Sequence, residues 1–120
     1  MSTIRNIAIL GSTGSIGQNS LEVVKNLQDR FRVTYLTTNK NIDLLQRQIV
    51  QFRPLGVVVL DEYNSSVLKK LVGDTVEVLS GEEGLLEIVK RDDVDLVVSS
   101  LVGFAGLKPT IEAIKHRKTV

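Results

Sequence analysis

The sequence predicts an α/β fold in which a doubly wound parallel sheet is flanked by helices, and three observations support this prediction. Five short runs of Val, Ile and Leu are apolar at successive positions, as in strands buried on both faces. Longer amphipathic stretches with helical spacing separate these runs. The chain has 120 residues, 42% of them hydrophobic and 24% charged, which is typical of one soluble domain.

The elements alternate between strand and helix along the chain, which favours right-handed crossovers between parallel strands. The predicted strands are Ile7–Leu10, Val33–Leu36, Val57–Leu60, Val76–Leu79 and Leu96–Val98. The predicted helices carry apolar stripes at Leu21, Val24 and Leu27; at Ile42, Leu44, Leu45, Ile49 and Phe52; at Val67, Leu68, Leu71 and Val72; at Leu85, Leu86, Ile88 and Val89; and at Ile111 and Ile114. Gly73 suits the end of the third helix and Pro109 the first turn of the fifth. Thr119 and Val120 are the expected start of a sixth strand.

Composition excludes several classes of function. Fifteen basic and fourteen acidic residues give a net charge of +1, so no concentrated positive charge points to nucleic acid or to an anionic membrane. The absence of Cys excludes a disulfide framework and a thiolate metal site or nucleophile. Aromatic residues make up only 4%, with no Trp, which argues against a stacking platform for single-stranded nucleic acid. No apolar stretch of 18 residues occurs, so no transmembrane helix is predicted.

The most informative motif is Gly11-Ser12-Thr13-Gly14-Ser15-Ile16-Gly17, which follows the first strand and opens the first helix. Its G-x-x-G-x-x-G spacing is a variant of the Rossmann dinucleotide fingerprint, with glycines for the strand exit, the approach to a pyrophosphate and close helix packing. The helix N-terminus offers free N–H groups to the phosphates, and the three hydroxyl residues add donors or caps. A P-loop is excluded, because no Lys follows the last glycine. The structural alternative is that these glycines are needed only for the geometry of the turn and not for binding a dinucleotide.

The residues at the end of the second strand are expected to determine the specificity for NAD(H) or NADP(H). An NAD-specific domain carries Asp or Glu there to accept from the ribose hydroxyls. This chain has Asn39, Lys40 and Asn41 instead, with no acid before Asp43. We therefore predict NADP(H), with its 2′-phosphate held by Lys40 and the two amides. The alternative is a solvated polar loop in which Asn41 caps the next helix.

Three other groups of residues are functional candidates. Residues 99–106 follow the fifth strand and either flank the cofactor or form a small-residue turn needed for packing. The carboxylates of Asp92, Asp93 and Asp95 precede that strand, where a solvated loop is favoured over a metal site. His116 is the only histidine and lies among basic residues, as expected of a surface position. The sequence offers no recognisable catalytic pair.

Several stretches together resemble the N-terminal part of the 1-deoxy-D-xylulose 5-phosphate reductoisomerase family. The glycine motif within residues 9–17 carries this resemblance with four further stretches: Phe31-Arg32-Val33, Asn39-Lys40-Asn41, Val102-Gly103-Phe104-Ala105-Gly106-Leu107-Lys108-Pro109-Thr110, and Ala113-Ile114-Lys115 followed by Lys118-Thr119. The glycines are shared with other dehydrogenases, whereas the combination is more specific. The family often has Gly where this chain has Asn39.

The resemblance implies an NADPH-dependent, typically homodimeric enzyme of the methylerythritol phosphate route to isoprenoids. Such an enzyme rearranges 1-deoxy-D-xylulose 5-phosphate and reduces the product to 2-C-methyl-D-erythritol 4-phosphate, with Mn²⁺, Mg²⁺ or Co²⁺ as metal. By residue matching, the cofactor-binding residues are Thr13, Gly14, Ser15, Ile16, Asn39, Lys40 and Asn41. No catalytic or metal residue is assigned, because the family's Ala-Asn-Lys-Glu segment and its metal-binding carboxylates correspond to positions beyond Val120.

Residues 1–120 are thus expected to form an NADPH-binding Rossmann domain, the N-terminal part of a longer enzyme, inactive by itself. The expected location is the cytoplasm, or a plastid-type organelle if a transit peptide has been removed. Two alternatives stay open from sequence: a stand-alone NADP(H)-sensing module, and the cofactor domain of another reductase such as a semialdehyde dehydrogenase. Because the chain has no Cys, a thiol nucleophile of such a dehydrogenase could not lie within these residues.

Overall fold

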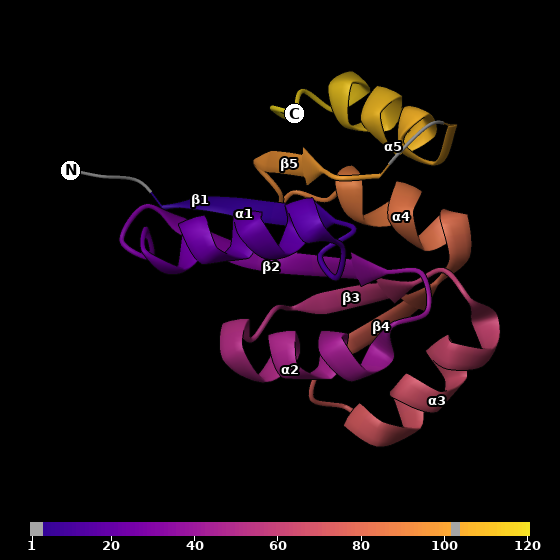
Figure 1. Ribbon diagram of the computed structural model, residues 1–120. Coiled ribbons are helices and arrows are strands. Elements are labelled where there is room, and N and C mark those ends of the chain that lie inside the picture. Colours follow the sequence, from indigo (N-terminus) through magenta and orange to yellow (C-terminus); the bar gives the residue numbers. More distant parts are fainter. Residues whose placement is uncertain (1–3, 102–103) are drawn as a thin grey trace.

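The computed structural model describes residues 4–101 and 104–120, in which strands and helices alternate along the chain (Figure 1). The strands are β1 (Arg5–Leu10), β2 (Phe31–Thr38), β3 (Gly56–Val59), β4 (Glu77–Ser80) and β5 (Leu96–Ser99). The helices are α1 (Ser15–Lys25), α2 (Ile42–Phe52), α3 (Glu62–Val72), α4 (Gly81–Val89) and α5 (Phe104–Lys115). The predicted α/β alternation is confirmed, with strand bounds shifted by a few residues.

The strands form one parallel sheet in the order β4-β3-β2-β1-β5. Strand β1 is the point where the order reverses, because β2 to β4 extend to one side of it and β5 lies on the other. Ligands of doubly wound sheets bind beyond the carboxyl ends of the strands at such a switch point. The topology therefore directs attention to the ends of β1, β2 and β5.

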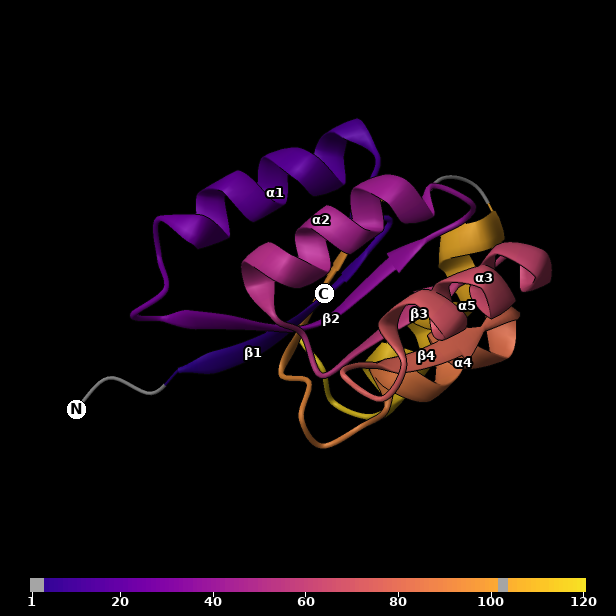
Figure 2. The ribbon, with the colours of Figure 1, turned by 90° about the horizontal axis from the view of Figure 1, so that it is seen from below.

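Two apolar layers cover the sheet, one on each face. Helices α1 and α2 lie on one side of the strands and α4 and α5 on the other (Figure 2). The first layer joins α1, α2 and α3 to strand residues such as Ile9 and Leu36. The second joins α4 and α5 to the alternate residues Ala8 and Leu10. Burial of β1 on both faces explains why its sequence is continuously apolar.

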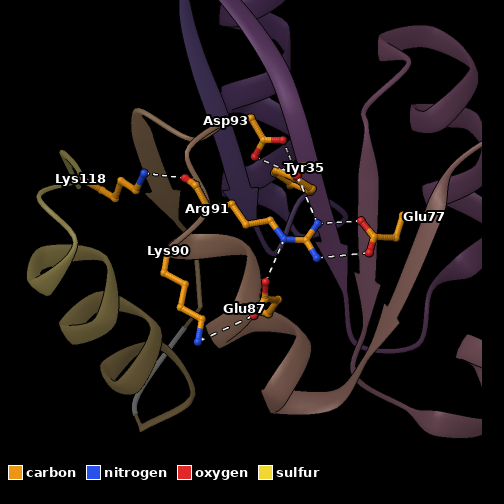
Figure 3. A network of polar contacts seen from close by, with 7 residues as sticks. All are labelled: Tyr35, Glu77, Glu87, Lys90, Arg91, Asp93 and Lys118. Carbon is orange, nitrogen blue, oxygen red and sulfur yellow. Dashed lines mark hydrogen bonds and ion pairs between the residues drawn. The ribbon is translucent and has the colours of Figure 1, made fainter.

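A hydrogen-bonded cluster closes the amino end of the sheet, and we call it the Arg91 network (Figure 3). The phenol of Tyr35, on β2, donates to both carboxylate oxygens of Asp93 at 2.9 and 2.8 Å. The Arg91 guanidinium forms two hydrogen bonds with Glu77 on β4, at 2.6 and 3.2 Å, and a third with Glu87 on α4 at 3.1 Å. It also lies 5.6 Å from the centroid of the Tyr35 ring. The network joins two strands, the end of α4 and the loop before β5.

Three features of the helices differ from the sequence expectation. Helix α1 ends at Lys25, so Leu27 belongs to the following turn. Leu71 of α3 and both predicted stripe residues of α5, Ile111 and Ile114, are exposed rather than part of buried stripes. Helix α5 begins at Phe104, which leaves Pro109 inside the helix and not in its first turn. The glycine-containing residues that precede Pro109 join the helix despite their weak helical pattern, because a tertiary environment overrides propensity.

The expected sixth strand is present only at its first position. Thr119 forms a single parallel bridge with Leu96: its carbonyl accepts from Val97 N at 2.7 Å and its amide donates to Asp95 O at 3.1 Å. Within the described residues, no helix is long and apolar enough to cross a membrane.

Candidate functional site

The turn between β1 and α1 needs glycine at its first position for two separate reasons. Gly11 has a φ of +82°, a conformation that favours glycine. A Cβ there would also lie 2.6 Å from the hydroxyl oxygen of Ser100. That hydroxyl hydrogen-bonds the carbonyls of Leu10 and Gly11 at 2.8 and 2.9 Å. The segment after β5 therefore packs against the exit of β1, as one of its two sequence interpretations requires. Residues 102 and 103, in the same segment, lie outside the described residues.

Gly17 permits the closest contact of the turn. A Cβ at this position would lie 2.1 Å from Gly11 O and 2.6 Å from Ser12 Cα. The first turn of α1 therefore rests directly on the backbone of the preceding loop. The glycine spacing predicts close packing of the helix at Gly17, and the structure shows that this contact is made with the turn itself.

Gly14 differs from these two glycines, because no crowding requires it. Its backbone angles, φ −77° and ψ 172°, are open to any residue. A Cβ would have only one neighbour within 4 Å, the carbonyl oxygen of Gly11 at an ordinary 3.6 Å. Gly14 is exposed at the N-cap of α1. Open space in front of a helix N-terminus is where a phosphate would be placed.

The N-terminus of α1 retains free backbone donors. The first intrahelical bond runs from Gln18 N to Gly14 O at 2.9 Å, so the amides of Ser15, Ile16 and Gly17 precede the helical ladder. The N-cap residue Gly14 has no side chain to accept from these amides, no other side chain of the described residues is bonded to them, and no acid occupies the first turn. Helices α2, α3 and α4 all carry Asp or Glu in that turn. An uncapped helix start without a nearby carboxylate favours a bound anion.

Two of the three hydroxyl groups of the turn do not cap α1 as expected. The buried Ser12 hydroxyl lies 2.7 Å from Gln48 Oε1 and 3.1 Å from Thr37 O, so it faces the protein rather than a phosphate. The Thr13 hydroxyl pairs with that of Thr38 at 2.6 Å. Neither caps α1. Ser15, by contrast, is exposed at the start of the helix.

The segment of residues 39–41 lies directly after β2 and next to the turn. All three side chains are exposed. Asn41 Oδ1 accepts from Leu44 N at 3.2 Å, so it caps α2, as the structural alternative requires. The carbonyl of Asn39 accepts from Asp61 N at 3.0 Å. Hydrogen bonds from Asn64 lower the pKa of Asp61 below its ordinary value, and the positive charge of Lys40 adds to this shift.

The two predicted binding segments meet at the carboxyl end of the sheet. Thr37, near the end of β2, holds the glycine turn in place: its hydroxyl accepts from Gly11 N at 2.7 Å and its carbonyl from Ser12 N at 2.9 Å. The Thr13–Thr38 contact adds a side-chain link. The glycine turn, the α1 amides and residues 39–41 therefore lie on the surface at the same edge of the sheet. Amide donors and the Lys40 cation suit a ligand that carries two separated anionic groups.

Sequence reasoning missed the polar residues beneath this surface. Thr37, Thr38 and Gln48 are almost completely buried. The available signal for Gln48 was its place on the apolar stripe of α2, three residues after the buried Leu45. A polar side chain in such a position usually has a hydrogen-bond partner.

The aspartates before β5 lie at the opposite end of the sheet and are not simply solvated. Asp93 accepts from Tyr35, and Asp95 Oδ2 accepts from Asn6 N at 2.8 Å; both residues are half-buried. His116 is exposed near the end of α5, as expected. Among residues 4–101 and 104–120, no three His, Asp or Glu side chains are grouped to hold a metal ion. The described residues thus do not fit a divalent metal site.

Comparison with known proteins places this geometry in a family. The family model described as 1-deoxy-D-xylulose 5-phosphate reductoisomerase matches residues 7–120. The protein of that name from Chloroherpeton thalassium is 52% identical over 118 residues, which are 98% of this chain and 30% of that protein. The one from Caldanaerobacter subterraneus subsp. tengcongensis is 46% identical over 117 residues, again 98% of this chain and 30% of the relative. The chain spans about 30% of the length of the curated relatives it matches.

Solved structures of the same family share the fold. The reductoisomerase from Zymomonas mobilis in complex with NADPH has a TM-score of 0.88 at 31% sequence identity, over 97% of this chain and 31% of that one. A DOX-P reductoisomerase in complex with NADPH, fosmidomycin and magnesium has a TM-score of 0.91 at 36% identity, over 96% of this chain and 29% of that one.

Proposed function

This chain belongs to the 1-deoxy-D-xylulose 5-phosphate reductoisomerase family, and from that premise we propose that it is the family's NADPH-binding part. The whole enzyme would convert 1-deoxy-D-xylulose 5-phosphate to 2-C-methyl-D-erythritol 4-phosphate for isoprenoid synthesis. It would act in the cytoplasm, or in a plastid-type organelle, as a homodimer. Residues 1–120 would form its N-terminal Rossmann domain. The observation that supports this proposal best is the uncapped start of α1, which lies at the same end of the sheet as the exposed Lys40.

The cofactor would lie across the carboxyl ends of β1 and β2. The amides of Ser15 and Ile16 would donate to the pyrophosphate, with Thr13 and Gly14 forming the adjoining wall. The open space at Gly14 leaves room for the phosphate oxygens. Bound NADPH supplies the hydride for reduction, and the chain's own residues bind and orient it.

The 2′-phosphate would rest on Asn39, Lys40 and Asn41. The Lys40 ammonium supplies charge, whereas the Asn41 carbonyl oxygen is already used to cap α2; its amide NH₂ is the group left for the phosphate. The Asp61 carboxylate close to Lys40 would compete with the phosphate for that charge. Lys40 is therefore the residue expected to separate NADPH from NADH.

The divalent metal of the family would be bound by ligands other than residues 1–120, since the described residues do not fit one. We accordingly assign no catalytic step to this chain. Purified residues 1–120 are expected to show no turnover of 1-deoxy-D-xylulose 5-phosphate with NADPH and Mn²⁺. Measurable turnover by the folded chain would contradict the division of labour proposed here.

Replacement of Lys40 by Asp tests the cofactor assignment. We expect Lys40→Asp to weaken NADPH binding by about 10- to 100-fold, the effect of losing a charge-assisted contact, and to change NADH binding much less. Fluorescence titration of both nucleotides gives the two dissociation constants. Lys25→Asp, an exposed charge reversal at the far end of α1, is the control. Equal weakening of both nucleotides by Lys40→Asp would overturn the 2′-phosphate assignment.

A further inference from the structure

Gln48 is a buried polar side chain that connects α2 to the glycine turn. Only 5% of the residue is exposed. Its Nε2 donates to Ser12 O at 2.8 Å, and its Oε1 accepts from the Ser12 hydroxyl at 2.7 Å. The side chain therefore forms two hydrogen bonds with a single residue that lies 36 positions earlier in the chain.

The orientation of the Gln48 amide follows from its partners. A backbone carbonyl can only accept, so the Gln48 atom that faces Ser12 O must be the NH₂ group. The Ser12 hydroxyl then donates to the remaining oxygen. Both functional groups of Gln48 are satisfied, and no buried side-chain polar atom of the described residues lacks a partner. The two directional hydrogen bonds of Gln48 therefore hold Ser12 in one position, whereas an apolar side chain would only be in contact with it.

The place of Gln48 in the fold gives this pair its significance. Helix α2 begins at Ile42, immediately after residues 39–41, so the position of α2 sets the position of Lys40. Ser12 belongs to the turn that precedes the α1 amides. The Gln48–Ser12 pair thus fixes the distance between the two segments assigned to the two ends of the adenosine diphosphate moiety. The Thr13–Thr38 contact is a second link of the same kind.

We propose that Gln48 is a positioning residue that sets the spacing between the pyrophosphate subsite and the 2′-phosphate subsite. The proposal rests on the proposed function. A ligand that occupies both subsites benefits from their fixed spacing, because its second contact is made without further ordering of the protein. A ligand that occupies one subsite gains nothing from it. Gln48 should consequently affect bidentate binding and leave monodentate binding nearly unchanged.

Two nucleotide probes separate these cases in residues 1–120. The first, 2′,5′-ADP, carries a phosphate for each subsite, whereas 2′-AMP reaches only residues 39–41. We expect Gln48→Met, which preserves size and removes both hydrogen bonds, to raise the dissociation constant of 2′,5′-ADP about tenfold. That of 2′-AMP should change less than about twofold. Gln51→Met, an exposed position on the same helix, is the matched control and should affect neither probe.

Gln48→Glu provides an independent measurement should Gln48→Met fail to fold. A protonated Glu can donate to Ser12 O as the Gln amide does, while an ionised Glu cannot. The affinity of Gln48→Glu for 2′,5′-ADP, relative to the wild type at the same pH, should therefore recover between pH 8 and pH 5. A flat relative affinity over this range would overturn the proposal.

The outcomes distinguish the proposal from the function on which it rests. Wild-type affinity for 2′,5′-ADP in folded Gln48→Met would show that the spacing does not depend on Gln48. An equal loss for both probes would indicate general damage to the site, which also contradicts a positioning role. If the folded wild-type chain binds neither probe, the cofactor assignment itself fails. Circular dichroism and thermal unfolding establish folding in each case.

Discussion

Polar groups are paired within the protein at one end of the parallel sheet, whereas several in the described part of the other end are left without internal partners. At the amino end, Arg91 binds Tyr35, Glu77 and Glu87, and Tyr35 in turn donates to Asp93. At the carboxyl end, the α1 amides have no capping side chain among the described residues, and Lys40 is exposed. One end is closed by internal hydrogen bonds, and the other offers donors and charge to the outside.

This difference separates stability from binding within one small fold. Groups that satisfy one another contribute to the free energy of unfolding but have no donor left for a ligand. Free amides and an exposed cation contribute little to folding, and their interaction energy is available to an anion. Substitutions in the Arg91 network should therefore alter stability without altering affinity. Most substitutions on the exposed surface of the carboxyl end should do the reverse.

Gly17→Ala should give the largest effect, and it is the exception to this separation because both stability and NADPH binding should be lost. Because its Cβ would lie 2.1 Å from Gly11 O, α1 must move away from the turn. We expect a loss of about 3 kcal/mol or more in the free energy of unfolding, at or beyond the upper end for overpacking. NADPH binding should be lost as well, since the amides move with the helix. Urea denaturation and fluorescence titration measure the two losses.

Gly14→Ala, three residues earlier, is the matched comparison. Its Cβ fits the backbone and the available space, so the free energy of unfolding should change by less than about 0.5 kcal/mol. The same methyl group would project beside the proposed phosphate position, and NADPH affinity should fall. Unchanged affinity in this variant would argue against a phosphate at the N-terminus of α1.

Tyr35→Phe should produce the reverse pattern at the other end of the sheet. It removes the hydroxyl that donates to the half-buried Asp93 carboxylate. We expect a loss of about 1–2 kcal/mol in the free energy of unfolding, the cost of a buried acceptor that loses its donor. NADPH affinity should stay at the wild-type value. A coupled loss of affinity would mean that the two ends of the sheet are not independent.

The pH dependence of stability should show a smaller effect of the Arg91–Glu77 pair. Hydrogen bonds from Arg91 lower the pKa of Glu77 below its ordinary value of 4.5. Its contribution is therefore complete above the pKa of the unfolded chain and is lost as the pH falls through the lower folded-state pKa. Arg91→Met should reduce stability by no more than about 1 kcal/mol near neutral pH, because the pair is partly exposed.

Urea denaturation from pH 7 to pH 3 tests this contribution. The decrease in stability on acidification should be shallower in Arg91→Met than in the wild type, since the variant has no ion pair to lose. Parallel curves for the two proteins would show that the Glu77 carboxylate gains no stability from Arg91.

Most of the fold and the outline of the site could be predicted from the sequence, because both depend on local patterns. Continuous apolar runs identify strands buried on two faces, and the glycine spacing identifies the turn at β1. The strand order did not follow from local patterns, since it depends on which strands meet in space. Position 109 shows the same limit: its proline by itself indicates a first turn, whereas α5 begins at Phe104 in the structure.

Contacts between distant residues account for what the sequence could not provide. The expected helix capping by Ser12 and Thr13 was wrong, because Gln48 and Thr38 bind their hydroxyls from positions 36 and 25 residues away. The aspartates before β5 appeared solvated, because their partners Tyr35 and Asn6 are remote in sequence. A hydroxyl or carboxylate in a loop gives no local sign of whether it faces a ligand, water or another strand.

The backbone amides of Ser15, Ile16 and Gly17 offer the most direct test of the central claim, that a dinucleotide phosphate binds at the start of α1. Titration of ¹⁵N-labelled protein with NADPH, followed by two-dimensional NMR, should shift these three amide resonances strongly. The amides around Lys40 should move with NADPH and much less with NADH. If saturating NADPH leaves the three α1 amides unmoved while the protein stays folded, the phosphate does not bind there and the account is wrong.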